Sequence, residues 1–329
     1  MTSELQLIER VRRKLPSLAK GLRIGIGDDA AVMRPRTGTD WVVTTDAFLE
    51  NVHFLRQVHP PRDVGYKALA RATSDIAAMG ARPQYFLMSL GLPPNSTGKW
   101  LDAFLDGMAT AARRFGLSLA GGDTTSYPTV IVNLTVIGEA EPGRAILRSG
   151  ARPGDVICVS GRLGEAEMGW RLAQRGLHNK KRRYRKLLRK HFHPEPRLEL
   201  GQWLAARQYA TSMIDTSDGL STDLGHICEA SDVGARLFEE KIPVVDVPPE
   251  LRRAGLDPLQ LALDGGEDYE LLFTVPKRMA ARLPKKIGGA TVTAIGEIMH
   301  GNQIVLVDAR GQDKAVKPGG WDSFHKESY

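Results

Sequence analysis

Residues 129–138, TVIVNLTVIG, decide the fold, because their content of Val, Ile and Thr predicts a buried β-strand. A glycine-rich acidic segment and a shorter predicted strand at 117–120 precede this stretch. After Gly143 the pattern begins again with a turn-forming sequence and a second apolar strand at 156–161. We therefore place a boundary near residues 140–150 and expect two domains, 1–145 and 146–329.

Helices and strands are predicted to alternate on both sides of that boundary. The expected helices are 3–15, 63–79, 98–115, 164–175, 197–207, 217–230 and 277–284. The other expected strands are 23–32, 41–46, 85–91, 213–215, 242–245, 270–275, 291–298 and 303–308. Each half thus predicts helices layered on a sheet, so the predicted fold class is α/β (α+β) with two α/β domains.

The overall composition is that of a soluble globular protein: 42% of the 329 residues are hydrophobic, 25% are charged and 34 are glycine. The first twenty residues lack an apolar signal core, and no apolar run is long enough to span a membrane, so we expect a cytoplasmic protein. Cys158 and Cys228 lie far apart without metal-binding spacing, and we expect both to be small core residues.

The net charge of +7 comes from one segment. Residues 178–193, HNKKRRYRKLLRKHFH, contain eight Lys and Arg and no acid, and without them the chain is close to neutral. Tyr184, Leu187, Leu188 and Phe192 recur at helical spacing, which favours a helix with a solvated basic face. RNA or membrane contact is the alternative, but no nucleic-acid module accompanies the segment, so nucleic acid is not the expected partner.

The turn Gly25–Ala30, GIGDDA, is close to the GxGxxA pattern that seats a dinucleotide pyrophosphate on a helix. Its two carboxylates, Asp28 and Asp29, would repel phosphate oxygens unless divalent cations lay between them. The pattern taken alone is also compatible with an acidic turn that has no function.

Acidic residues recur at the predicted ends of elements or in apolar helical settings. Each one alone has a structural interpretation, as a turn residue, a helix cap or the partner of an arginine. Together they would be costly to bury without cations, and Mg²⁺ favours such oxygen ligands together with substrate phosphates. Arg144 and Arg148 could clamp the phosphate oxygens. The acidic set is Asp28, Asp29, Asp46 after Thr44 and Thr45, Asp75, Asp123, Asp215 and Asp218.

Other nucleotide chemistries fit less well. Gly98-Lys99 is followed by Trp100, so no P-loop is present, and the protein-kinase, HExxH and GxSxG patterns are also missing. A phosphotransferase that relies on metals and positioning needs none of them. His53, Trp321 and the segment Gly265–Leu271, GGEDYEL, remain as candidates for contact with a substrate, although a packed histidine and a capping tryptophan are the simpler interpretations.

The ordered set GIGDDAA, TTD followed by NVHF, SDIAAMGA, GGDTT, DTSDGL and GGEDYEL spans nearly the whole chain. This set resembles the thiamine-monophosphate kinase family, within the superfamily of aminoimidazole ribonucleotide synthetase and selenophosphate synthetase. The resemblance implies direct in-line transfer from ATP to thiamine phosphate, with several Mg²⁺ ions as cofactors. It also implies a homodimer in which the N-terminal sheet pairs with its mate in a barrel, and a C-terminal domain that covers the site.

The resemblance also implies roles for individual residues. Asp28 is expected to orient ligands rather than to bind metal. Another ATP-dependent synthetase of the superfamily and a noncatalytic nucleotide- or RNA-binding module are the alternatives. The implied metal ligands are Asp29, Thr44, Thr45, Asp46, Asp75, Asp123, Asp215 and Asp218; the implied ATP contacts are Gly122, Asp123, Arg148 and Ser217; the implied contacts to thiamine phosphate are His53, Glu267 and Trp321.

Overall fold

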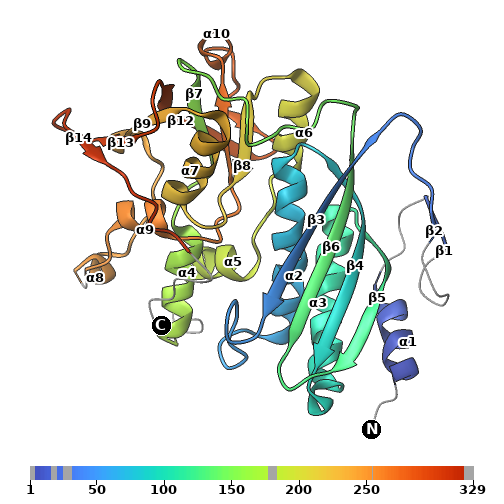
Figure 1. Cartoon of the computed structure of the whole chain (residues 1–329). Coiled ribbons are helices and arrows are strands. Elements are labelled where there is room, and N and C mark those ends of the chain that lie inside the picture. The colour runs from blue at the N-terminus through green and yellow to red at the C-terminus, as the bar shows by residue number, and fades with distance from the viewer. Residues whose placement is uncertain (1–3, 16–20, 25–31, 177–183, 254, 322–329) are drawn as a thin grey trace. The chain divides into compact units, whose positions relative to one another are not determined.

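A computed structural model describes residues 4–15, 21–24, 32–176, 184–253 and 255–321. Its contacts divide the chain into two compact units, each built from a sheet and covering helices (Figure 1). The N-terminal unit comprises Met1–Ile76 and Ala81–Gly143, and the C-terminal unit comprises Ala77–Gly80 and Arg144–Tyr329. The mixed α/β class expected from the sequence is confirmed.

The N-terminal unit is built on a four-stranded sheet in the order β3-β6-β4-β5. Strand β6 pairs antiparallel with both β3 and β4, whereas β4 and β5 are parallel. A separate antiparallel pair, β1 and β2, and the N-terminal helix α1 complete the unit. The bounds are α1 Glu4–Lys14, β1 Leu22–Ile24, β2 Val32–Met33, β3 Asp40–Leu49, α2 Pro61–Ala78, β4 Arg82–Leu92, α3 Lys99–Phe115, β5 Ser118–Ser126 and β6 Ile131–Ala140.

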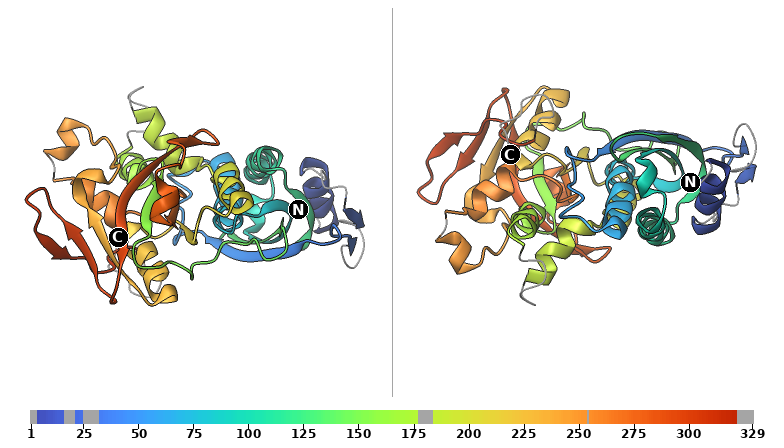
Figure 2. Two further views of the ribbon diagram at one scale, coloured as in Figure 1. Left: turned by 90° about the horizontal axis from the view of Figure 1, so that it is seen from above. Right: turned by 90° about the horizontal axis from the view of Figure 1, so that it is seen from below.

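Helices α2 and α3 lie on the same face of this sheet (Figure 2). The two helices pack very closely, because a Cβ at Gly65 would overlap the Phe104 carbonyl and one at Gly107 would overlap the Arg62 carbonyl. Strand alternation turns the other sheet face outward. On that outer face Trp41 is 40% and Val43 is 57% exposed.

The C-terminal unit contains an eight-stranded sheet, in which seven strands follow the order β14-β13-β9-β12-β7-β10-β8 and β11 pairs with β12. All of its pairs are antiparallel except β13 with β9. The strands are β7 Val156–Ser160, β8 Ser212–Asp215, β9 Gly234–Phe238, β10 Leu271–Val275, β11 Lys286–Ile287, β12 Ala290–Met299, β13 Ile304–Val307 and β14 Asp313–Ala315. The helices are α4 Glu165–Gln174, α5 Arg185–Phe192, α6 Leu198–Arg207, α7 Leu220–Ser231, α8 Pro249–Arg252, α9 Pro258–Asp264 and α10 Lys277–Ala280.

Both faces of the central strands of this sheet are covered. Leu272 joins an apolar cluster with Leu224 of α7, whereas its neighbours Leu271 and Phe273 join another cluster with Leu204 of α6. Because successive side chains of a strand point to opposite faces, α7 and α6 cover opposite sides. Apolar clusters on both faces of the sheet therefore hold β8 and β10 in place.

Two sequence expectations about elements are wrong. Residues 242–245 form no strand, and only an isolated bridge joins Val244 to Leu163; the strand β9 lies earlier in the chain. Asp46 and Asp123 do not end their strands, because β3 continues to Leu49 and β5 continues to Ser126 through pairing with their neighbours.

Cys158 and Cys228 are both buried and free, as expected for core residues. Burial raises the pKa of Cys158 to about 12 and that of Cys228 to about 11, so both thiols stay protonated. In the part of the chain that the structure describes, no helix has the length and hydropathy needed to cross a membrane.

Candidate active site

The loop from Asp215 to Gly219 joins β8 to α7 and carries two carboxylates, with a third in the first turn of α7. Asp215 is the buried last residue of β8, and Asp223 lies in the first turn of α7. Asp223 Oδ2 accepts hydrogen bonds from the Asp218 and Gly219 N–H groups, at 3.2 and 3.0 Å. Burial, together with the nearby Asp215 and Asp218, raises the pKa of Asp223 well above its usual range. This loop therefore concentrates negative charge in a poorly solvated place.

The segment Gly265–Glu270 pairs with this acidic loop along its backbone. The Glu267 N–H donates to the Ser217 carbonyl at 2.8 Å, and the Tyr269 N–H donates to the Thr216 carbonyl at 2.9 Å. A Cβ at Gly266 would overlap the Ser217 carbonyl, so the close approach requires glycine there. The DTSDG and GGEDYEL motifs, far apart in sequence, thus form one ribbon.

The described end of the chain joins the same ribbon. The Trp321 N–H donates to the Asp218 carbonyl at 3.1 Å, and the Gly320 N–H donates to Thr222 Oγ1 at 3.1 Å. A Cβ at Gly320 would overlap the Asp218 carbonyl. The C-terminal unit therefore brings together five predicted site residues, namely Asp215, Ser217, Asp218, Glu267 and Trp321.

A second group of predicted residues lies between β3 and α2 in the N-terminal unit. Thr44 Oγ1 donates to Asp75 Oδ2 at 2.6 Å, and Arg71 Nη2 lies 3.1 Å from Asp46 Oδ1. The Arg71 guanidinium also sits 5.0 Å from the centre of the Phe48 ring. Asp75 follows Arg71 by one helical turn, so both side chains lie on the same face of α2. From that face Arg71 contacts Asp46 of β3, and Asp75 contacts Thr44 of β3.

Thr45 and Asp123 lie on the other face of the same sheet. Thr45 Oγ1 accepts hydrogen bonds from Asn133 Nδ2 at 3.3 Å and Thr135 Oγ1 at 3.4 Å. Asp123 is opposite Ser89 in the β4–β5 register and is exposed. Gly122 precedes it where a Cβ would overlap the Met88 carbonyl. The structure therefore divides this part of the predicted ligand set between two sheet faces.

Four predicted residues, His53, Arg148, Asp28 and Asp29, stand outside these groups. His53 Nδ1 accepts a hydrogen bond from the Leu49 N–H at 3.1 Å, which leaves the proton of a neutral ring on Nε2. The Arg148 carbonyl accepts from Ser231 Oγ at 3.3 Å, at the opposite end of α7 from Ser217, and the twelve-residue helix spans ~18 Å. Asp29 and its neighbour Asp28 lie outside the described residues.

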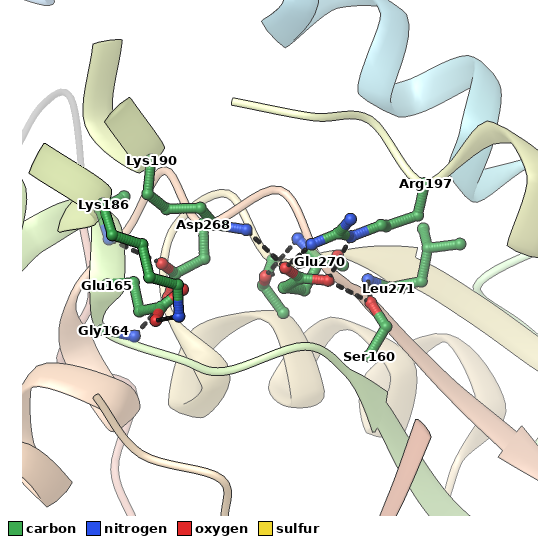
Figure 3. Close-up of polar contacts among 11 residues, drawn as sticks. Ser160, Gly164, Glu165, Lys186, Lys190, Arg197, Asp268, Glu270 and Leu271 are labelled. Carbon is green, nitrogen blue, oxygen red and sulfur yellow. Dashed lines mark hydrogen bonds and ion pairs between the residues drawn. The ribbon is translucent and has the colours of Figure 1, made fainter. Parts of the chain in front are cut away.

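The sequence places Glu270 in the segment expected to contact a substrate, but the structure shows it fully buried at the end of the 265–270 segment. Lys190 Nζ lies 2.5 Å from Glu270 Oε1, Arg197 Nε donates to Oε2 at 2.6 Å, and Ser160 Oγ donates to Oε2 at 2.5 Å (Figure 3). Burial alone would raise the pKa of Glu270, but Lys190 and Arg197 outweigh burial and hold it at about 2. The signal in the sequence is an acid directly before the apolar run LLFTV.

Asp268 anchors the start of α4. Its carboxylate accepts hydrogen bonds from the Gly164 N–H and, at 2.9 Å, from the Ala166 N–H (Figure 3). Burial raises the pKa of Asp268 to about 7. The expectation that the GGEDYEL acids face a substrate is therefore wrong for Asp268 and Glu270, which are buried and bound inside the C-terminal unit, and stays a prediction for Glu267.

The expected solvated basic face of residues 178–193 is only partly correct. Arg185, Lys186 and Arg189 of α5 are exposed, but the Lys190 side chain is only 10% exposed because it reaches Glu270. Lys186 Nζ lies 2.7 Å from Glu165 Oε1. The remaining basic residues, Lys180, Lys181, Arg182 and Arg183, lie outside the described residues.

A divalent cation fits the carboxylates of the acidic loop. Asp223 Oδ1 is buried and has no hydrogen-bond partner within the described chain, close to Asp215 and Asp218. A cation there would offset the repulsion that a buried carboxylate otherwise feels. Among the described residues no ready-made group of three or more His, Cys, Asp or Glu side chains is arranged around a metal position. Mg²⁺ characteristically uses few carboxylates and completes its shell with water and phosphate oxygens.

Two family models match the chain in order. The model of the AIR synthase related protein N-terminal domain matches residues 27–140, and that of the C-terminal domain matches residues 152–309. The thiamine-monophosphate kinase of Escherichia coli (strain K12) is 37% identical over 331 residues, covering 98% of each chain. That of Mycobacterium tuberculosis (strain CDC 1551 / Oshkosh) is 35% identical and covers 98% of this chain and 91% of its own.

Solved structures show the same similarity. The thiamine-monophosphate kinase of Stenotrophomonas maltophilia K279a superposes with a TM-score of 0.79 at 36% identity, covering 95% of this chain and 98% of its own. The structure of AaThiL complexed with AMPPCP and TMP superposes with a TM-score of 0.77 at 32% identity, covering 97% and 96%. The hydrogenase maturation protein HypE, at 23% identity and a TM-score of 0.75, shares the fold.

Proposed function

The chain belongs to the thiamine-monophosphate kinase family of AIR synthase related proteins, and from this premise we propose that it transfers the γ-phosphoryl group of ATP to thiamine phosphate. The products are ADP and thiamine diphosphate. The relative complexed with AMPPCP and TMP supports this pair of substrates, because it is 32% identical over almost the whole chain.

The observation that carries the proposal is the ribbon of the C-terminal unit. Backbone hydrogen bonds of 2.8 to 3.1 Å join the loop that carries Asp215 and Asp218 to the segment that carries Glu267 and to Trp321. Carboxylates that suit a cation and an aromatic side chain that suits a flat ring are thus held in one framework. Phosphoryl transfer needs such positioning more than it needs a reactive side chain.

Several Mg²⁺ ions are part of the proposal. When bound, they would neutralise charge on the phosphate oxygens. In the C-terminal unit Asp215 and Asp218 would hold them; in the N-terminal unit Asp46 and Asp75, which contact Arg71 and Thr44, would do so. Thr44, Thr45, Asp123 and Asp29 complete the proposed ligand set. Asp223, which the sequence analysis did not select, stays beneath the acidic loop and holds its backbone.

The proposed binding residues fall into one set for ATP and another for thiamine phosphate. Gly122, Asp123, Arg148 and Ser217 are proposed to contact ATP; the distance of Arg148 from Ser217 along α7 means that they would contact different parts of it. His53, Glu267 and Trp321 are proposed to contact thiamine phosphate, with His53 able to donate from Nε2 to a phosphate oxygen. The substrate phosphate is itself the nucleophile, so orientation for in-line attack replaces a strong general base.

We also propose a homodimer formed through the outer face of the N-terminal sheet. Trp41 and Val43, at 40% and 57% exposure, are large apolar side chains on a face that no described helix of the unit covers. A second copy of the same face would bury them in a symmetric contact. Val43→Lys should therefore convert a dimer to a monomer in light-scattering measurements; an unchanged mass would contradict this interface.

The activity is tested by incubating the protein with ATP, Mg²⁺ and thiamine phosphate and separating the products by chromatography. Thiamine diphosphate should appear in step with ADP and should stop appearing when a chelator removes the metal. ADP formation that depends on a different acceptor would instead favour another ATP-dependent synthetase of the superfamily. No turnover with any acceptor would favour a binding module.

A further inference from the structure

The segment Gly265–Glu270 has a backbone conformation that its residues do not prefer. Glu267 has φ of +68° and Tyr269 has φ of +50°, both in the left-handed region that residues with side chains avoid. Such a conformation persists when surrounding contacts hold it in place, and it is frequent at functional sites. The contacts that hold this segment are therefore informative.

The C-terminal end of the segment is held by Glu270. Lys190 and Arg197 reach the Glu270 carboxylate from two sides, and Ser160 donates to it as well (Figure 3). The carboxylate also lies where a Cβ on Gly161 would overlap it. Two cations and one hydroxyl thus fix a fully buried anion at the point where the segment enters β10.

The middle and the start of the segment are held by the neighbouring helices. Asp268 accepts from the first N–H groups of α4, and Glu267 Oε2 lies 3.5 Å from His191 Nδ1. His191 itself stacks on Trp170 of α4, with ring centres 5.5 Å apart. Because His191 follows Lys190 directly, two consecutive residues of α5 contact the acids at positions 267 and 270.

We propose that Lys190 and Arg197 are positioning residues for the acceptor substrate. By holding Glu270, they keep segment 265–270 in its left-handed conformation and present Glu267 toward thiamine phosphate. This inference rests on the proposed function. It also gives the described part of the basic segment a role inside the enzyme rather than at its surface.

The effect should fall on the acceptor more than on ATP. The acidic loop, including Ser217, has supports of its own: it is continuous with β8 and α7, and Asp223 binds the Asp218 and Gly219 N–H groups. Glu267, in contrast, lies within the strained segment itself. Loosening that segment therefore displaces Glu267 first.

The test compares Lys190→Gln with Arg189→Gln, a matched change on the same helix. Arg189 is 63% exposed and pairs with Glu195 at 3.2 Å. Loss of a charged hydrogen bond to Glu270 should raise the KM for thiamine phosphate at least about tenfold in Lys190→Gln, with the KM for ATP changing less than about twofold. Arg189→Gln should leave both values near those of the wild type.

Hydrogen exchange of the substrate-free protein provides a readout that does not depend on activity. The Glu267 and Tyr269 amides should exchange faster in Lys190→Gln than in Arg189→Gln, because their hydrogen bonds to Ser217 and Thr216 open more often. A wild type without kinase activity would refute the proposed function, while this exchange comparison would still test the positioning role.

Arg197→Lys serves as a milder variant in case Lys190→Gln does not fold. It keeps the charge but loses the paired hydrogen bonds of Arg197 to Glu270, so the KM for thiamine phosphate should rise about threefold and exchange in the segment should increase. The proposal is overturned if folded Lys190→Gln or Arg197→Lys keeps wild-type KM and exchange. It is also overturned if the two KM values rise in equal proportion.

Discussion

Each of the two units contains a group of candidate carboxylates, and the two groups differ in how the surrounding protein accommodates their negative charge. In the N-terminal unit, Asp46 is paired with Arg71 and Asp75 accepts from Thr44, so each carboxylate has a partner from the protein itself. In the C-terminal unit, burial together with the neighbouring Asp215 and Asp218 raises the pKa of Asp223. Because its carboxylates are buried close to one another, the second group would gain more from a bound cation.

The largest expected effect tests whether the N-terminal group takes part in catalysis. Asp75→Asn keeps the size of the side chain but removes a charge proposed to bind metal. It should lower kcat on the order of 10²–10³-fold, by analogy with the loss of one group that stabilises transition-state charge. Steady-state kinetics with circular dichroism as a folding control provide the measurement. Activity near that of the wild type at saturating Mg²⁺ would remove Asp75 from the metal site.

Stability in the absence of metal tests the contrast between the two groups. Asp46→Asn removes the negative charge that contacts the Arg71 guanidinium, 13% exposed, and should lower the free energy of unfolding by about 2–3 kcal/mol. Asp223→Asn removes repulsion and should leave that free energy unchanged or raise it on the order of 1 kcal/mol. Urea titration in the presence of a chelator compares them. Equal destabilisation by both changes would contradict the proposed difference between the N-terminal and C-terminal groups of carboxylates.

A smaller effect is expected at the acceptor side of the C-terminal unit. Trp321→Ala should raise the KM for thiamine phosphate by an amount equivalent to about 1–3 kcal/mol, if its ring stacks as aromatic side chains do on bases. The KM for ATP should hardly change. Initial-rate measurements with each substrate varied in turn will show this. A rise of both KM values would instead indicate that the end of the chain supports folding, consistent with its bonds to Asp218 and Thr222.

The pH dependence of stability isolates Asp268, whose pKa rises from 3.8 to about 7 on folding. Between those values the folded state retains a proton that the unfolded state has lost, so this contribution falls as pH rises, by up to about 1.4 kcal/mol per pH unit, and levels off above pH ~7. Glu270, whose pKa is lowered from 4.5 to about 2, contributes a constant amount only above pH ~5.5. The stability of Asp268→Asn relative to the wild type should therefore improve from pH 5 to pH 8 in thermal unfolding. A difference independent of pH would contradict the raised pKa.

Much of the fold could be predicted from local patterns. The strand expected at 129–138 is β6, Ile131–Ala140, and the helix expected at 63–79 is α2, Pro61–Ala78. Periodicity identifies such elements because they are long and apolar on one face. Strand β9, VGARLF with its flanking valine, was missed because it is short and carries an arginine; pairing with β12 and β13 decides its structure.

The site was less predictable, because its decisive contacts join residues far apart in sequence. The Glu270 carboxylate binds Ser160, Lys190 and Arg197, which come from other parts of the chain. No local sequence pattern predicts those pairs. Gly-Gly-acid occurs both at 121–123 and at 265–267, yet the first lies in a regular strand and the second in a left-handed loop. Residues 121–123 are held in an extended conformation by pairing with β4. That pairing joins distant parts of the chain, so the local sequence does not reveal it.

The most direct test of the proposed activity is a competition among acceptors in one reaction mixture. Purified protein, Mg²⁺ and γ-labelled ATP are mixed with thiamine phosphate, free thiamine and aminoimidazole precursors, and the labelled products are separated. The label should enter thiamine diphosphate alone, since free thiamine lacks the phosphate oxygens that must attack in line. Efficient labelling of free thiamine, or release of labelled inorganic phosphate that depends on an aminoimidazole precursor, would contradict the assignment.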